Sequence, residues 1–128
     1  MVVDILKVRV GNIWLDDNNI IRYVITPGMD ETLDDLIEVI KAIDEIRNGN
    51  VYPLLGDIRG AKSITREARQ YAEKSIVATA SAILVGSPVS KVLGNFVIKI
   101  HKSKIPVKLF TSEDEAINWL KGFSNPTS

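Results

Sequence analysis

Polar residues gather directly after three short apolar runs, where they could take part in binding or catalysis. The runs end at Gly56-Asp57-Ile58-Arg59-Gly60, at Gly86-Ser87-Pro88 and at Phe110-Thr111-Ser112. If the runs are neighbouring parallel strands, their carboxyl ends meet at one edge of a sheet, where α/β proteins bind ligands. We therefore expect a docking or ligand rim made of Asp57, Arg59, Lys62, Ser63, Thr65, Arg66, Ser87, Ser90 and Thr111.

This rim has two interpretations. In the functional one, helix N-termini at the rim offer backbone N–H groups to an anion or to a phosphorylated side chain. In the structural one, Thr65, Ser87 and Thr111 only cap helices, as Ser and Thr commonly do, and Asp57 accepts hydrogen bonds from loop backbone. Both interpretations stay open at this point.

No pattern in the chain indicates catalysis. The segment from Gly56 to Gly60 lacks the G-x-G-x-x-G spacing, no Gly-Lys-Ser/Thr element occurs, and Gly86-Ser87-Pro88 does not match G-x-S-x-G. The one histidine, His101, stands among lysines where a cation would complement a helix C-terminus. The absence of Cys excludes disulfides, thiolate zinc sites and cysteine nucleophiles. We expect no catalytic residue, no metal site and no cofactor.

Length and composition indicate an ordinary globular domain. The chain has 128 residues, of which 45% are hydrophobic and 25% charged, and its formal net charge is zero. A neutral balance argues against nucleic-acid binding, which needs an excess of basic residues. No apolar stretch is long enough to cross a membrane and no signal peptide is visible, so we expect no integral membrane association and a cytoplasmic location. We expect one domain over residues 1–123 and a loose tail over 124–128.

Hydrophobic periodicity predicts the elements that must position the rim. Apolar residues alternate from Leu6 to Val10 and from Ile21 to Ile25, with breaks at Gly11-Asn12 and Asp17-Asn18-Asn19, which favours antiparallel strands. Later segments alternate between helical stripes and short apolar runs. They predict helices after Thr32, Thr65, Ser87 and Thr111 or Ser112, strands over 51–58, 79–85 and 105–110, and a left-handed helix end at Gly49. The fold class is therefore α/β, with a mixed sheet, an N-terminal hairpin, later parallel strands and about four helices.

Helix exteriors carry charge of opposite sign. Acidic residues mark the first helix (Asp34, Asp35 and Glu38), and lysines mark the third (Lys91, Lys99, Lys102 and Lys104). Such faces are commonly just solvated. They could also be complementary patches for partner docking or homodimerisation. We expect the two tryptophans, Trp14 and Trp119, to fill the core.

The chain from about residue 4 to 123 resembles the STAS fold, in its SpoIIAA-like branch. The resemblance is carried by the early hairpin, by Leu54-Leu55-Gly56-Asp57-Ile58-Arg59-Gly60 leading to a helix at Thr65, by Ala80 to Val85 with Ser87-Pro88, and by the closing segment from Pro106 to Leu120. It implies a mixed sheet with helices largely on one side, acting as a protein-docking module. Anti-sigma factor antagonists of this type carry a phosphorylated Ser at the start of the second helix.

That phosphorylation motif is altered in this chain. The matching place falls at about Thr65-Arg66-Glu67, where no Ser stands and the Asp-Ser-Ser-Gly character is missing. Ser63 and Thr65 are the neighbouring candidate phosphoacceptors. The chain looks closer to uncharacterised stand-alone relatives than to the sporulation regulators.

Three functions can be ranked from these observations. We expect a non-enzymatic protein-interaction or regulatory module, with a protein partner or self-association. The alternative is a binding domain for an anionic or lipid-like small molecule at the carboxyl ends of the parallel strands. An enzyme ranks last, because no nucleophile–base pair, metal cluster or cofactor motif supports it.

Overall fold

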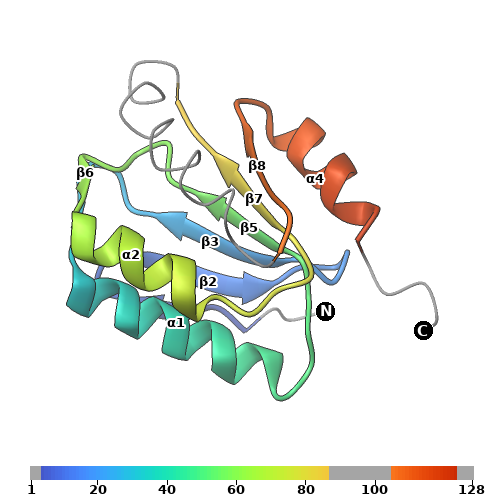
Figure 1. Ribbon diagram of the computed structural model, residues 1–128, viewed down its shortest axis with the longest axis horizontal. Helices are drawn as coiled ribbons and strands as arrows, with labels where there is room; N and C mark the ends of the chain where they lie inside the picture. The colour runs from blue at the N-terminus through green and yellow to red at the C-terminus, as the bar shows by residue number, and fades with distance from the viewer. Residues whose placement is uncertain (1–3, 87–104, 124–128) are drawn as a thin grey trace.

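A mixed β-sheet forms the centre of the molecule (Figure 1). The computed structural model describes residues 4–86 and 105–123. Within them, six strands pair in the order β1-β2-β3-β5-β7-β8. These strands are β1 (Leu6–Val8), β2 (Gly11–Leu15), β3 (Ile21–Ile25), β5 (Leu54–Asp57), β7 (Ser81–Leu84) and β8 (Val107–Phe110).

The strand directions confirm the predicted fold class. The pairs β1–β2 and β2–β3 are antiparallel, whereas β3–β5, β5–β7 and β7–β8 are parallel. On one face of the sheet, Gly56 of β5 lies between Tyr23 of β3 and Ile83 of β7. The carboxyl ends of β5, β7 and β8 meet at one edge, as the sequence predicted for the rim.

Helices cover both faces of the sheet. Helices α1 (Leu33–Arg47) and α2 (Arg66–Ser75) lie side by side on one face, and α4 (Glu113–Lys121) packs on the other (Figure 1). The expectation of helices largely on one side is therefore wrong for the described residues. Alternation along the strands is the cause, because Leu54 faces α1 and α2 whereas Leu55 faces α4. The fourth predicted helix, after Ser87, and the predicted loose tail lie outside the described residues.

The helix ends largely follow the predicted caps. Thr32 and Asp35 form a reciprocal capping box at the start of α1, and Thr65 caps α2. At the end of α1, however, Asn48 and not Gly49 is the capping residue, with a left-handed φ of 46°. Of the two residues proposed to cap the last helix, the structure selects Ser112.

The predicted break at Gly11-Asn12 is displaced. Both residues belong to β2, and the turn falls on Arg9 and Val10. Gly11 is needed there because a Cβ atom at its position would lie 2.2 Å from the backbone oxygen of Val24 on β3. The glycine therefore marks a close approach of two strands and not a turn.

Two hydrophobic clusters hold the layers together. The larger one lies between the sheet and α1 and α2, and includes Ile21, Tyr23 and Leu54. The smaller one, with Leu55 and Leu120, lies beneath α4, and Trp119 packs against it as predicted. Trp14 belongs to neither cluster, so the prediction for it is wrong; its ring lies 5.7 Å from the guanidinium carbon of Arg22.

A second, two-stranded sheet joins the segments that enter α1 and α2. It pairs β4 (Asp30–Glu31) in parallel with β6 (Ser63–Ile64). Outside the ladder, the backbone of Lys62 donates to Met29 and that of Thr65 donates to Glu31. The starts of the two helices are therefore fixed to one another. Within the described residues, no helix has the length and apolar character needed to cross a membrane.

Candidate functional site

At the carboxyl end of β5, Asp57 and Arg59 form a closed pair. The Arg59 guanidinium donates two hydrogen bonds to the Asp57 carboxylate, of 3.0 and 2.7 Å, and the Arg59 backbone N–H donates a third. Burial alone would raise the pKa of Asp57, but these contacts hold that pKa below its ordinary value. Both side chains therefore already have partners in the absence of any ligand.

A chain of ion pairs continues from this pair to α4. Glu113 lies 3.6 Å from Arg59 and 3.4 Å from Arg22, and Arg22 lies 3.3 Å from Asp16. Three carboxylates thus face two guanidinium groups. This balance gives the edge no surplus of positive charge with which to attract an anion.

The other rim residues lie apart from this cluster. Lys62, Ser63 and Thr65 belong to the segment that forms β6 and enters α2. The Ser63 hydroxyl donates to Asp30 at 2.5 Å, and the Thr65 hydroxyl accepts from the backbone of Ala68 at 3.2 Å. Capping explains Thr65, as the structural interpretation proposed. Arg66 is exposed on α2.

The remaining predicted residues do not complete a single shared rim. Thr111 is exposed directly after β8. Ser87, Ser90 and His101 lie outside the described residues. The predicted rim is thus divided between a charged cluster at β5 and α4 and a hydrogen-bonded segment at β6 and α2.

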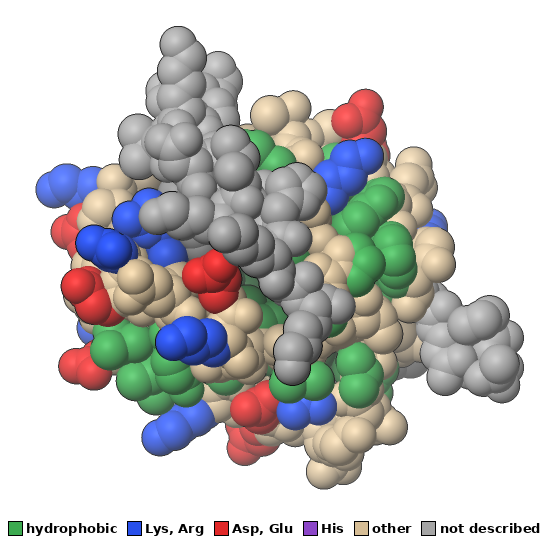
Figure 2. Space-filling view, viewed as in Figure 1, with side chains coloured by type: hydrophobic (Ala, Val, Ile, Leu, Met, Phe, Trp, Pro, Cys, Tyr) green, Lys and Arg blue, Asp and Glu red, His purple; other side chains and the backbone are tan. Residues whose placement is uncertain are grey.

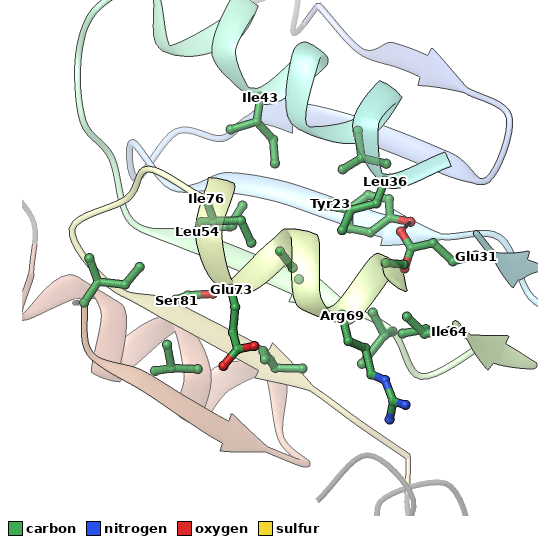
Figure 3. Close-up of a pocket in the computed structure, with 18 residues that line it drawn as sticks. Tyr23, Glu31, Leu36, Ile43, Leu54, Ile64, Arg69, Glu73, Ile76 and Ser81 are labelled. Carbon is green, nitrogen blue, oxygen red and sulfur yellow. Dashed lines mark hydrogen bonds between the residues drawn. The ribbon is translucent and has the colours of Figure 1, made fainter. Parts of the chain in front are cut away.

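A cavity of about 90 Å³ lies between α2 and the sheet (Figure 3). Its wall is mostly apolar and includes Leu36 and Val39 of α1 and Ile83 of β7. On α2, Arg69 and Glu73 point away from α1 toward the side of β7 and β8 (Figure 3). The sequence analysis placed no site here.

Small residues leave this volume unfilled. Gly56 lies on the sheet side, and a Cβ atom built on it would meet no other atom within 4 Å. On the helix side, the buried residues of α2 are Ala68 and Ala72. A glycine facing two alanines is too small to close the space between a helix and a sheet.

One end of the cavity is polar and buried. Glu31 is 3% exposed and accepts a hydrogen bond of 2.8 Å from the Tyr23 hydroxyl (Figure 3). Burial raises the pKa of Glu31, although the Tyr23 hydrogen bond acts against this, and burial next to Glu31 also raises the pKa of Tyr23. The pair is therefore held toward its neutral, protonated form.

The sequence carried two indications of this site that its analysis did not use. Gly56 interrupts an otherwise apolar buried strand, and the predicted inner stripe of the second helix contains the alanines Ala68 and Ala72. Glu31 could not be predicted, because its burial depends on the pairing of β4 with β6. No group of three or more His, Asp or Glu residues in the described ranges could hold a metal ion.

A solved structure shares this fold. An uncharacterised protein of the DUF3478 family from Shewanella loihica PV-4, described as having a SpoIIAA-like fold, matches with a TM-score of 0.57 and 13% identity over 93% of this chain and 92% of that one. This confirms the SpoIIAA-like fold. A protein of unknown function from Arthrobacter sp. FB24 matches with 26% identity and a TM-score of 0.33, over 90% of this chain and 95% of that one.

The family comparison covers most of the chain. No curated protein matches it. Residues 13–124 match the family described as a domain of unknown function, DUF7793. This range includes most of β2, all elements from β3 to α4 and every described residue of the cavity wall. The chain therefore belongs to the DUF7793 family.

Proposed function

We propose that this protein is a non-enzymatic binding module that holds a small apolar molecule in the cavity between α2 and the sheet. The observation that carries the proposal is the unfilled volume facing Gly56, Ala68 and Ala72. The sequence offered, as an alternative, a lipid-like ligand at the carboxyl ends of the parallel strands. The site proposed here for such a ligand lies instead on one face of the sheet.

The energetic cost of the cavity supports a role in binding. Protein interiors are packed as densely as organic crystals and leave few voids larger than a water molecule. The residues that line a cavity of about 90 Å³ lack the packing contacts that close neighbours would supply, which costs stability. Valine or leucine at these positions would recover part of that energy, so the small residues are best explained by an occupant.

The chemistry of the walls favours an apolar occupant over an anion. Most of the lining is apolar, and burying a negative charge against hydrocarbon is costly. At the rim, Asp57 and Arg59 already satisfy one another. An anion there would have to break that pair and leave Asp57 buried without a cation.

Backbone amide NMR with propane as the probe tests the proposal. Propane, with three carbons, is smaller than benzene, which fills an engineered apolar cavity of about 150 Å³. We expect saturable shifts of the amides of Gly56, Ala68 and Ala72. Gly56→Val places three carbons in the cavity and should abolish these shifts.

The matched control is Lys7→Val, an exposed position on β1. It adds the same side chain to a strand outside the cavity and should leave the shifts unchanged. The proposal is wrong if wild-type protein shows no saturable shift up to the solubility limit of propane. It is also wrong if Gly56→Val folds and binds the probe as the wild type does.

A protein-interaction role is a second candidate, favoured by the composition of α2. Of its ten residues only Ala68 and Ala72 are buried, and acidic and basic side chains alternate over the exposed surface of α1 and α2 (Figure 2). Sedimentation of wild type and the double variant Arg66→Glu, Lys74→Glu tests self-association through this face. The candidate predicts that the wild type associates and that the variant is monomeric.

A further inference from the structure

The polar end of the cavity contains a carboxyl group with one protein partner. Glu31 belongs to β4, at the point where the chain leaves β3 for α1, and its side chain lines the cavity. In the described part of the chain, the hydrogen bond that its side chain makes is the one from the Tyr23 hydroxyl to Oε1. A carboxyl group carries two oxygens, so Oε2 is available to a group inside the cavity.

The surroundings of Glu31 determine which group could bind there. Tyr23 and the apolar wall residues Leu36 and Ile58 border the same cavity. Burial and, to a smaller extent, the nearby Asp35 carboxylate raise the pKa of Glu31, whereas the Tyr23 hydrogen bond lowers it. A carboxyl group in either protonation state can bind a hydroxyl group, which both donates and accepts hydrogen bonds, whereas burial disfavours a ligand carboxylate, which brings a negative charge.

The cavity also limits the size of what it holds. A volume of about 90 Å³ equals the liquid volume of about three water molecules, at roughly 30 Å³ each. A molecule, or the end of a longer one, can therefore place only a few carbon atoms there. A ligand of this size that is apolar except for one polar group matches both the apolar wall and the polar end of the cavity.

We infer, on the basis of the proposed function, that the ligand presents a few apolar carbons and one neutral hydroxyl group, and that Glu31 binds this hydroxyl. The ligand class is thus a small alcohol or the hydroxyl-bearing end of a lipid. Glu31 supplies the preference for the hydroxyl, and Gly56, Ala68 and Ala72 supply the space for the carbons.

Three probes built on one carbon skeleton test the inference by NMR titration at pH 7: propane, 2-propanol and isobutyrate. The quantity measured is the ratio of the Kd for propane to the Kd for 2-propanol. The variant is the double substitution Glu31→Leu, Tyr23→Phe, which removes both hydrogen-bonding partners and leaves neither buried and unsatisfied. We expect this ratio to fall roughly 5- to 10-fold in the double variant, the effect of one lost hydrogen bond.

Tyr23→Phe alone is the matched control, because it keeps the Glu31 carboxyl group and should keep most of the ratio. An unchanged ratio in the double variant would overturn the inference and leave the proposed function intact. Tighter binding of isobutyrate than of 2-propanol would overturn the ligand class. If none of the probes binds wild-type protein, the proposed function itself fails.

Discussion

Arg9 and Asp35 connect the turn between β1 and β2 to the first turn of α1. The Arg9 guanidinium donates two hydrogen bonds to the Asp35 carboxylate, of 2.6 and 2.5 Å. The same carboxylate accepts a hydrogen bond from the backbone of Thr32. Hydrogen bonds from Arg9 hold the pKa of Asp35 well below its usual value, with a smaller contribution from Thr32.

Asp35→Asn should therefore destabilise the protein in a pH-dependent manner. A carboxyl group whose pKa is lowered by folding stabilises the folded state above its unfolded pKa, near 3.8. We expect a loss of about 1–2 kcal/mol at pH 7, since Arg9 is exposed and solvent weakens the pair. The difference should shrink as the pH falls below about 4. Urea unfolding at pH 7 and pH 3 measures both values.

The control for this variant is Asp34→Asn, at the exposed neighbouring position in the same helix turn. It removes one charge near the helix N-terminus and should cost less than about 1 kcal/mol. Equal losses for the two variants would contradict a specific role for the contact between Arg9 and Asp35.

Gly56→Ala should stabilise the protein. The added methyl group enters open space, and the position does not have a positive φ, so alanine fits its backbone. Replacing glycine also lowers the entropy of the unfolded chain, and we expect a gain of about 0.5–1 kcal/mol in unfolding free energy. Thermal unfolding of the ligand-free protein measures it. A lower Tm would show that the space is not open.

Gly11→Ala should have the opposite effect, although it is the same substitution on another strand. Its methyl group would meet the Val24 backbone oxygen at 2.2 Å, so β2 and β3 would have to separate. Overpacking of this kind costs about 1–3 kcal/mol. Both variants change the entropy of the unfolded chain in the same way. A comparison of the urea midpoints of Gly11→Ala and Gly56→Ala therefore reports the effect of the space around each glycine.

Arg59→Ala should destabilise the protein by leaving Asp57 without its cation. Asp57 is 8% exposed, and a buried acceptor that loses its donor costs about 1–3 kcal/mol. Its pKa should rise, so the loss should be largest at neutral pH and smaller near pH 3, where the carboxyl group is protonated. Arg66→Ala on exposed α2 is the control and should change the unfolding free energy by less than about 0.5 kcal/mol. Chemical denaturation at both pH values measures the two variants.

The fold was predictable because local patterns agree with the tertiary structure. The alternation from Ile21 to Ile25 and the apolar run before Asp57 predicted strands, and Thr32 and Thr65 predicted helix starts. Helix α4 was predicted, but its location on the opposite face was not. That location depends on Leu55 and Leu84 facing away from α1 and α2, which a short buried run does not reveal.

The site was less predictable than the fold, for a physical reason. Asp57 and Arg59 are polar residues at a strand end, a position that predicts a binding site, yet their side chains hydrogen-bond to one another. The cavity depends on the small side chains of three residues from two elements, Gly56 on β5 and Ala68 and Ala72 on α2. Only the register of β5 beneath α2 brings these small residues together.

The way α2 is attached has a consequence for how occupancy could be sensed. Its start is anchored by the β4–β6 pairing and the Thr65 cap. Along its length, Ala68 and Ala72 are the fully buried residues, and Tyr71 packs against the core while only partly buried. A helix that is fixed at one end and has few fully buried residues along its length can tilt when a molecule enters the cavity beneath it. We therefore expect an occupied cavity to shift the charged outer surface of α2, so that a partner reading this surface would respond to the contents of the cavity.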